Sequence, residues 1–425
     1  MGAFLVEEST YMSVMSEPAT SGVTPASASE IARLRAPASA KVVLLALTQI
    51  TGGALLASLP DGRWLKFGDA EGDAVELRIN TYGFARRVLI NGDIGFAEGW
   101  MAGEWDTPDL SALLTLLAAN VERFLRVFEG SALGKSLNCF RHITRDNTRR
   151  GSKRNILAHY DLGNRFYEAW LDASMTYSSA RFDDKVRDLE DAQLAKYRAL
   201  AEHLRLEPSD HVLEIGCGWG GFAEFAAREY GARVTAITIS DEQFDYARAR
   251  MERAGLSHLV EVRKQDYRDV EGRFDKVASI EMFEAVGERH WPAYFQKIAD
   301  VLKPGGRAGL QIITIDDQLF PKYRKRADFI QRYVFPGGML ASVERLREEV
   351  SRAGLVWQAA EGFGQSYAQT LAEWGRRFQA KWDEIRAMGF DERFKRLWLF
   401  YLGYCEAGFR TGRTDVVQLE LAKPA

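Results

Sequence analysis

Cysteine, histidine and net charge are scarce in this sequence, and each shortage argues against a class of protein. Cys139, Cys217 and Cys405 lie far apart without a C-x-x-C pair, which disfavours a disulfide framework and a zinc site and favours a reducing, cytosolic setting. The six histidines show no metal-ligand spacing, so no metal is expected. A net charge of −3 gives no general attraction to nucleic acid, and no nucleic-acid-binding motif appears.

Long apolar runs are missing as well. Residues 1–40 lack a basic start followed by an apolar core, so no signal peptide is predicted. Their "SEPATSGVTPASASE" is rich in Ser, Ala, Thr and Pro and predicts a disordered tail. The uncharged stretch 42–60 is interrupted by polar residues and glycines, whereas a membrane span needs about 20 mostly apolar residues. We therefore expect a soluble chain with at most surface contact with a membrane.

The length of 425 residues predicts two domains. Short strands and turns are expected over 42–91, with strands at "AVELRIN" (74–80) and "RRVLIN" (86–91). With the helical pattern that follows over 109–130, they predict a small α+β N-terminal domain at 41–134. Residues 135–156 hold many Lys and Arg and a single acid. They are interpreted as a basic linker, with contact to anionic lipid head groups as the functional alternative.

The second predicted domain covers residues 157–425 and alternates helices with strands. We expect helices at 188–206, from 220, at 241–255 and up to 302, and strands at 211–215, 233–239, 259–265, 274–280 and, after a stop at "KPGG", 307–315. This rhythm predicts an α/β fold whose mostly parallel sheet is covered on both faces. Ligands of such sheets bind beyond the carboxyl ends of the strands.

The first strand of that domain runs directly into glycines in "VLEIGCGWGGF" (212–222). The spacing satisfies G-x-G-x-x-G, so a dinucleotide site is one reading and close helix–strand packing is another. A nicotinamide site would need an acid after the second strand, where Thr238 and Ser240 stand instead. Glu214 before the first glycine and Asp266 after the third strand are instead typical of S-adenosylmethionine (SAM) methyltransferases, which place the amino-acid end of SAM at a helix N-terminus.

Several longer motifs stand in one order along the chain. They are "GDIGFAEGWMAGEWDTPDL" (92–110), "HYDLGNRFYEAWLDASMTYSSARF" (159–182), the glycine loop, "AITISDEQ" (236–243), "SIEMFEAVGERHW" (279–291) and "VFPGGML" (334–340). Together they resemble the cyclopropane-fatty-acyl-phospholipid synthase family. The resemblance implies a Rossmann-like class I SAM methyltransferase with a small lipid-handling N-terminal domain. It also implies methyl transfer to a cis double bond of an unsaturated phospholipid, and makes a homodimer a candidate assembly.

Two rival functions stay open at this stage. A SAM methyltransferase of a soluble small molecule explains the sheet domain but not the N-terminal domain. A non-catalytic lipid-binding protein explains the N-terminal domain but not the glycine loop.

The resemblance assigns SAM contacts residue by residue. They are Tyr177, Ser178, Glu214, Gly216, Gly218, Gly220, Thr238, Ile239, Gln243, Asp266 and Tyr267. For proton removal the family uses a bound bicarbonate, and Glu284, Tyr367 and the backbone of Ile313 match residues that hold it. This chain departs from the family at Ser179, where a cysteine is common, and at Ala285 and Gln311, where histidines are common. Serine and glutamine still donate hydrogen bonds, so an anion site is expected.

The C-terminal helical pattern supplies aromatic rings for a carbocation. Phe394, Trp398, Tyr401, Cys405 and Gly408 recur at three- and four-residue steps, which places them on one helix face, either as a core stripe or as a pocket wall. Cys405 matches a cysteine often assigned to the active site of the family, and we interpret it as pocket lining.

The departures from the family leave the product open between a cyclopropane ring and a methyl or methylene branch. Docking on the inner face of a membrane is predicted for "PKYRKRADFIQRYVFPGGML" (321–340), in which basic and aromatic residues alternate, with an exposed solvated helix as the alternative.

Overall fold

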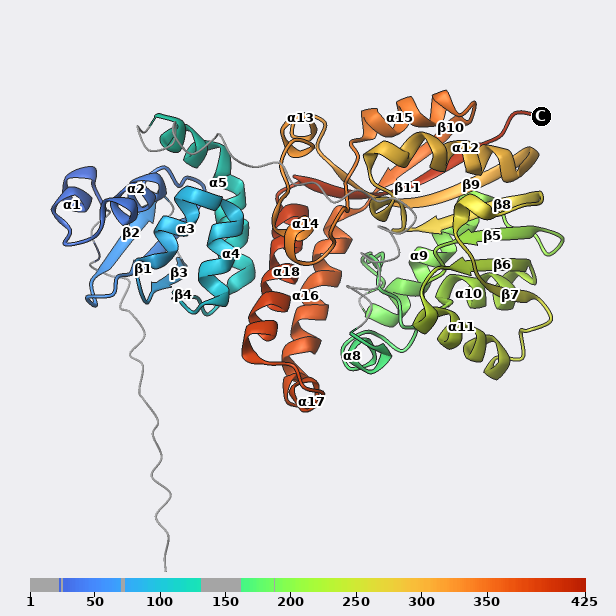
Figure 1. Cartoon of the computed structure of the whole chain (residues 1–425), viewed down its shortest axis with the longest axis horizontal. Helices are drawn as coiled ribbons and strands as arrows, with labels where there is room; N and C mark the ends of the chain where they lie inside the picture. The colour runs from blue at the N-terminus through green and yellow to red at the C-terminus, as the bar shows by residue number, and fades with distance from the viewer. Residues whose placement is uncertain (1–22, 24–25, 70–72, 131–161, 187) are drawn as a thin grey trace, which may run out of the picture.

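The computed structural model describes residues 23, 26–69, 73–130, 162–186 and 188–425. The predicted basic linker and residues 1–22 of the predicted tail lie outside these ranges. The chain forms two sheets, one of four strands and one of seven. Figure 1 shows the smaller sheet with its helices on one side of two upright helices, α16 (Gly364–Ala380) and α18 (Glu392–Arg410), and the larger sheet on the other.

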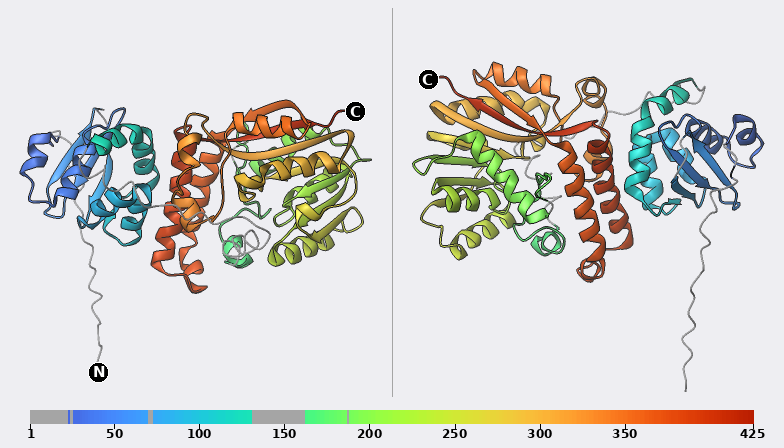
Figure 2. Two further views of the ribbon diagram at one scale, coloured as in Figure 1. Left: turned by 45° about the horizontal axis from the view of Figure 1, so that its top comes forward. Right: turned by 180° about the vertical axis from the view of Figure 1, so that it is seen from behind.

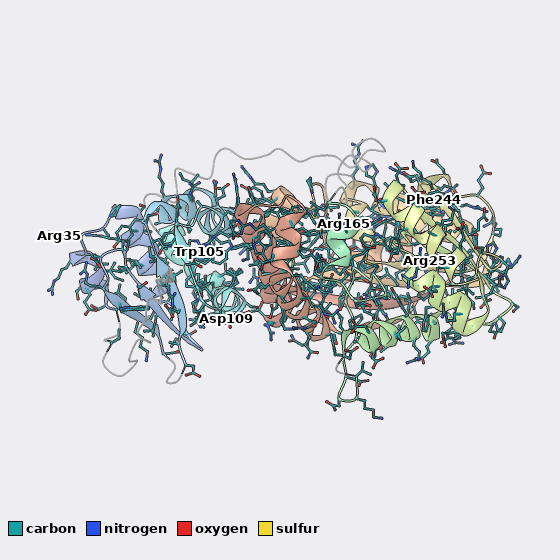
Figure 3. All side chains as sticks on the ribbon, turned by 90° about the horizontal axis from the view of Figure 1, so that it is seen from below. Arg35, Trp105, Asp109, Arg165, Phe244 and Arg253 are labelled. Atoms are coloured by element: carbon teal, nitrogen blue, oxygen red, sulfur yellow. The ribbon has the colours of Figure 1, made fainter. Side chains whose placement is uncertain are left out.

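The N-terminal domain is α+β, as predicted. Its elements are α1 (Ala28–Arg33), α2 (Ala38–Leu47), β1 (Ala54–Ser58), β2 (Trp64–Gly68), β3 (Val75–Ile79), α3 (Gly83–Asn91), α4 (Asp93–Met101), β4 (Trp105–Asp106) and α5 (Leu110–Gly130), with strand order β2-β1-β3-β4. Trp105, labelled in Figure 3, is fully buried and stacks on Phe96 at 4.1 Å. This aromatic pair lies in the core of the domain.

Two sequence predictions are corrected in this domain. Residues 28–33 and 38–47 are helical, so a tail extending to residue 40 is too long. A capping box between Ser27 and Glu30 starts α1, and Ile31 is buried against the core. "RRVLIN", expected to be a strand, is the second half of α3, because Phe84, Ala85 and Val88 pack on one helix face.

The large sheet has the order β10-β11-β9-β8-β5-β6-β7. Its strands are β5 (His211–Ile215), β6 (Arg233–Thr238), β7 (Val260–Lys264), β8 (Phe274–Ile280), β9 (Leu302–Ile315), β10 (Val356–Gly362) and β11 (Thr414–Ala422). β5 to β9 are parallel, and only β11 runs antiparallel to its neighbours. The predicted α/β domain is therefore confirmed, although β9 begins before the predicted "KPGG" stop and β10 and β11 were not anticipated.

Both faces of this sheet are buried, as parallel strands require. Alternate residues of β5 point to opposite sides. Val212 belongs to the apolar cluster that includes residues of α9 (Leu189–Leu204) and α10 (Gly221–Tyr230), whereas Leu213 belongs to the cluster that includes residues of α12 (Trp291–Val301) and α15 (Val343–Arg352). Figure 2 shows these helix pairs on the two faces of the sheet. The carboxyl ends of β5, β6 and β8 consequently meet at one edge, where the predicted site lies.

The N-terminal domain packs directly on α18. Trp100 Nε1 donates to the carbonyl oxygen of Arg396 at 2.9 Å, and the Arg396 guanidinium pairs with Asp106 at 2.7 Å. Tyr333 donates to Glu98 at 2.8 Å in the same interface. A single apolar cluster continues from this domain through α18 into α16. In the described part of the chain, the helices are too short or too polar to cross a bilayer.

Candidate active site

The glycine loop joins β5 to α10 with backbone conformations that favour glycine. Gly216, Gly218 and Gly220 have φ values of 79°, 53° and 85°. A Cβ on Gly216 would lie 2.5 Å from Met282 Cγ, whereas one on Gly218 would meet nothing within 4 Å. The loop is thus packed on one side and open on the other, at the N-terminus of a ten-residue helix.

Glu214 gives this loop an acidic partner suited to a cationic ligand. It is buried, and burial raises the pKa of its carboxyl to about 8 despite the nearby Arg250 and Lys196. Its Oε2 has no hydrogen-bond partner among the described residues. A buried acceptor beside an open glycine loop fits the ammonium end of SAM, so the residues present suit this cofactor.

The residues that follow β6 and β7 lie at the same carboxyl edge of the large sheet as the glycine loop. Thr238 donates to Gln243 Oε1 at 2.9 Å, and both side chains are buried, so the pair fixes the loop before α11 (Asp241–Arg253). Asp266 receives three hydrogen bonds from Arg268, one backbone and two side-chain. Tyr267 packs edge-on to Tyr294 at 5.4 Å. The predicted adenosine-contacting positions are therefore gathered, and Asp266 is already ion-paired.

Tyr177 and Ser178 lie between the loop and the helices α16 and α18. The Tyr177 and Tyr401 hydroxyls are 2.7 Å apart, which ties this segment to α18. The Tyr177 ring is 5.2 Å from Trp374 and 5.4 Å from Tyr167, whose ring in turn is 5.0 Å from Trp219 of the glycine loop. An unbroken run of rings thus connects the predicted cofactor loop with α16 and α18.

A buried lysine lies beneath this segment. Lys196 on α9 is fully buried and donates to Ser178 Oγ at 2.7 Å. Desolvation lowers its pKa to about 7, against the opposing effect of Glu281, Asp172 and Glu214. The sequence analysis missed Lys196, although Leu189, Lys196 and Leu200 fall on one apolar helix face.

Glu281 is the centre of a polar cluster that the sequence analysis also missed. Oε1 accepts from the Ser179 backbone N–H at 2.8 Å and from Gln311 Nε2 at 2.7 Å, and Oε2 accepts from the Tyr367 hydroxyl at 2.6 Å. Gln311 and Tyr367 donate with their side chains, as expected, but Ser179 does so with its backbone, because its hydroxyl donates to Ala180 O. The sequence did indicate this position, because Glu281 directly follows the strand β8 and so lies at the ligand-binding edge of the sheet.

Glu284, three residues further on, lies close to Glu281. Its Oε1 accepts from the Ile313 backbone N–H at 2.5 Å, and its Oε2 is buried without a hydrogen-bond partner among the described residues. Desolvation and repulsion from Glu281 raise its pKa to about 8. Three hydrogen-bond donors face Glu281 and one faces Glu284. This difference favours an ionised Glu281 beside a protonated Glu284 at neutral pH.

The predicted face of α18 forms part of this wall. Trp398 lies 5.6 Å from Phe394 and 5.2 Å from Tyr401. Cys405 is partly buried and close enough to Tyr401 and Tyr367 to affect their pKa values. Burial raises the pKa of the Cys405 thiol, which disfavours the reactive thiolate and agrees with a lining role.

In the segment predicted to contact a membrane, residues 321–340, the basic and the aromatic residues differ in exposure. The side chains of its basic residues are exposed: Lys322, Arg324, Lys325, Arg326 and Arg332. Phe329, however, is fully buried in α14 (Phe329–Tyr333), so the alternation of basic and aromatic residues does not form one exposed surface. A basic surface is present, and Phe329 is not part of it.

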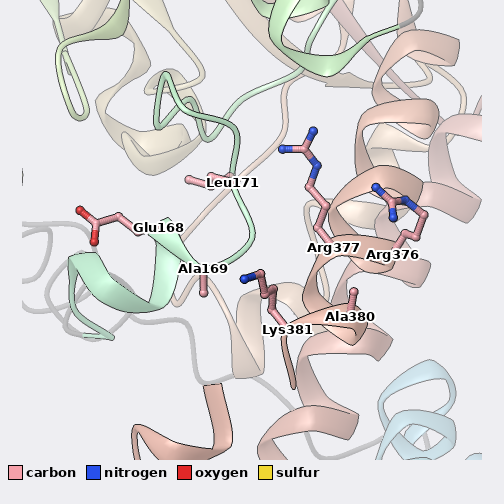
Figure 4. A pocket seen from close by; sticks show the side chains of 7 residues that line it. All are labelled: Glu168, Ala169, Leu171, Arg376, Arg377, Ala380 and Lys381. Atoms are coloured by element: carbon pink, nitrogen blue, oxygen red, sulfur yellow. The ribbon is translucent and has the colours of Figure 1, made fainter. Parts of the chain in front are cut away.

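A pocket of about 400 Å³ lies away from the glycine loop, between the region of α8 (Asn164–Glu168) and the end of α16 (Figure 4). Arg376, Arg377 and Lys381 line it, which would suit an anion. Each is paired with a glutamate at 3.1 Å or less, so their charges are already compensated. This pocket contains none of the predicted site residues.

Solved structures place this fold in a known class of enzyme. The mycolic acid cyclopropane synthase CmaA1, in complex with SAH and CTAB, matches with a TM-score of 0.60 and 29% identity over 64% of this chain and 98% of its own. Coclaurine N-methyltransferase, solved with N-methylheliamine and SAH, matches with a TM-score of 0.58 at 19% identity, which reflects the fold alone. The protein is a class I SAM-dependent methyltransferase.

Comparison with sequence families narrows the class. The family model of mycolic acid cyclopropane synthetase matches residues 147–419. Tuberculostearic acid methyltransferase UfaA1 of Mycobacterium tuberculosis is 40% identical over 354 residues, 80% of this chain and 81% of the relative. Cyclopropane-fatty-acyl-phospholipid synthase of Escherichia coli is 35% identical over 383 residues, 86% and 95% of the two chains. The chain belongs to the cyclopropane synthase family of lipid methyltransferases, which confirms the resemblance drawn from its motifs.

Proposed function

We propose that this enzyme transfers the methyl group of SAM to the double bond of an unsaturated acyl chain in a membrane phospholipid, through a carbocation. The observation that carries the proposal is the run of aromatic rings from Trp219 to Trp398 beside the Glu281 cluster. An alkene is a weak nucleophile, and its methylation leaves a cation that water would quench. Aromatic faces stabilise a desolvated cation by about 2 kcal/mol, and a neighbouring carboxylate can accept the proton that must leave.

In this proposal, each group of residues has a separate role. The glycine loop and Glu214 hold the amino-acid end of SAM, which supplies an electrophilic sulfonium methyl group. Thr238, Gln243, Asp266 and Tyr267 border its ribose and adenine. The rings of α16 and α18 exclude water and line the acyl chain. Proton loss from the transferred carbon then closes a cyclopropane ring or, after a hydride shift along the chain, leaves a methylene branch.

The names of the relatives support both products, since one is a tuberculostearic acid methyltransferase and the other a cyclopropane-fatty-acyl-phospholipid synthase. A saturated methyl branch would require a separate hydride donor after methylene formation. The chemistry common to all these outcomes is a new carbon on the acyl chain and the loss of one proton.

The experiment is a labelled-methyl transfer assay with unsaturated phospholipid vesicles, followed by gas chromatography and mass spectrometry of the acyl chains. Vesicles of saturated phospholipid are the matched control. Label in unsaturated chains alone supports the proposal, and mild hydrogenation separates a methylene branch, which takes up hydrogen, from a ring, which resists it. Label found only in a water-soluble product contradicts the proposal.

Docking on the cytoplasmic face of the membrane completes the proposed function. The exposed basic residues of 321–340 would be attracted to anionic head groups by about 1 kcal/mol each. Three of them already contact acids or a carbonyl on the protein, because Arg324 pairs with Glu288, Lys322 with Glu122, and Arg326 donates to Asn91 O. The electrostatic attraction is therefore expected to be moderate and sensitive to salt.

A further inference from the structure

Glu281 occupies the position for which the family resemblance predicts a bicarbonate ion. The predicted ligands of that ion were Ser179, Glu284, Gln311, Ile313 and Tyr367. In the structure, three of them donate hydrogen bonds to the Glu281 carboxylate and the fourth donor, the Ile313 N–H, is taken by Glu284. A bicarbonate ion would have to displace a carboxylate of the same charge and shape, so the residues present do not fit it.

The donors are held in place for this one acceptor. Gln418 on β11 donates to Gln311 Oε1 at 3.0 Å, which leaves the Gln311 NH₂ group to face Glu281. The Tyr367 ring stacks on Phe409 at a centroid distance of 4.4 Å. Ser179, Gln311 and Gln418 are each 0% exposed. Three fixed donors preorganise one ionised carboxylate.

The backbone at Glu281 is also unusual. Its φ of 49° lies in the left-handed region that glycine adopts freely and other residues rarely do. Such conformations cost of order 1–3 kcal/mol and are retained where a function requires them. A glutamate at a position that suits glycine therefore indicates that its carboxylate is needed there.

We infer that the Glu281 carboxylate replaces bicarbonate in this enzyme and is the base that takes the proton from the methylated acyl chain. The inference rests on the proposed function. The π electrons of the alkene form the new carbon–carbon bond to the SAM methyl group, and the bonding pair of that methyl group stays on sulfur. The neighbouring carbon is left with a positive charge.

The base then acts on the transferred carbon. A C–H bond of this carbon breaks, its proton moves to a Glu281 oxygen, and its electron pair closes the ring. After a hydride shift onto the cationic carbon, the same pair forms the carbon–carbon double bond of a methylene branch. The proton later passes from Glu281 to water, so no oxidant or reductant is consumed. The charge balance is the same for both products.

Burial suits this role. Desolvation raises the pKa of Glu281 above its usual value, against the opposing effect of Tyr367 and Lys196. A carboxylate with a raised pKa is a stronger base than an exposed one while it remains ionised through its three donors.

The test compares three proteins in carbon-dioxide-free buffer with and without added bicarbonate. The wild-type rate is expected to be the same in both. Glu281→Gln keeps the shape but removes the base, and its rate should fall about 10²–10⁴-fold without rescue. Glu281→Gly suits the backbone and leaves a carboxylate-sized space, so its rate should fall similarly and recover as bicarbonate is added. Glu271→Gln, at an exposed position, is the matched control.

A second readout does not depend on turnover. Binding of ¹³C-labelled bicarbonate, followed by nuclear magnetic resonance, should be detected with Glu281→Gly and not with wild type. Heat of adenosylhomocysteine binding and thermal melting establish that the variants are folded. A wild-type enzyme that binds bicarbonate or requires it, or a Glu281→Gly variant active without it, overturns the inference. If wild type labels no phospholipid, the proposed function fails, while the binding comparison still decides whether Glu281 takes the place of the ion.

Discussion

Removing the Tyr367 hydroxyl tests how far the Glu281 cluster controls the reaction. This hydroxyl donates to Glu281 Oε2 at 2.6 Å, and the ring stacks on Phe409 independently of it. Tyr367→Phe therefore removes one hydrogen bond to a charged group and leaves the packing in place. Such a bond stabilises the ionised carboxylate by about 1.5–3 kcal/mol, so its loss leaves a smaller fraction of Glu281 ionised. The rate on the acid limb should fall by up to roughly 10- to 150-fold.

The sign of the pH effect follows from the same bond. Tyr367 stabilises the ionised form of Glu281 and so lowers its pKa. Without the hydroxyl, the pKa of Glu281 rises further above its usual value, because the ionised carboxylate loses a hydrogen bond. The acid limb of the kcat/KM profile for phospholipid methylation should therefore shift to higher pH. An unchanged profile with an unchanged rate would show that Glu281 does not act through this cluster and would refute the reasoning.

Three further predictions follow from other residues. Glu214→Gln removes the buried carboxyl that ionises opposite the ammonium group of the bound ligand. It should weaken adenosylhomocysteine or SAM binding about tenfold or more in calorimetry, because a hydrogen bond between charged partners is lost, and unaltered affinity would remove Glu214 from the site. The pKa of Glu284 is raised from 4.5 to about 8 in the folded state, so its protonated form contributes stability that is fully present below pH 4.5 and is lost as the pH rises through 8. Glu284→Gln should therefore flatten the decline of the melting temperature over this pH range, and parallel curves for the two proteins would contradict the assignment. Lys322→Glu combined with Lys325→Glu should weaken binding to anionic vesicles and reduce its salt dependence, with neutral vesicles as the control, and binding that salt leaves unchanged would exclude the electrostatic contribution.

The parts of the fold that local patterns determine could be predicted. The β–α alternation predicted a mostly parallel sheet, because each strand is a short apolar run that ends at a turn. α3 was mistaken for a strand because its packing on the core, and not the β-branched residues in "RRVLIN", decides its structure. β10 and β11 lie after the predicted alternation, and β11 pairs with β9 about a hundred residues earlier in the chain, which no local pattern records.

The candidate site likewise combines residues that a local pattern reveals with residues that only tertiary packing brings together. The glycine loop and Glu214 are contiguous in sequence and were found together. The Glu281 cluster joins residues 179, 281, 311 and 367, whose proximity depends on tertiary packing. The resemblance directed attention to Glu284, the familiar carboxylate, while Glu281 stood three positions earlier in the same motif. Lys196 was also missed, because a lysine in a helix ordinarily reaches solvent and its burial depends on tertiary packing.

Transfer from SAM carrying a deuterated methyl group to unsaturated phospholipid vesicles, measured by mass spectrometry of the acyl chains, tests the central claim most directly. The account predicts a modified chain that has lost one deuterium from the delivered carbon, because the base removes a proton from that carbon for either product. A modified chain that retains every deuterium, or acyl chains without label, would contradict it.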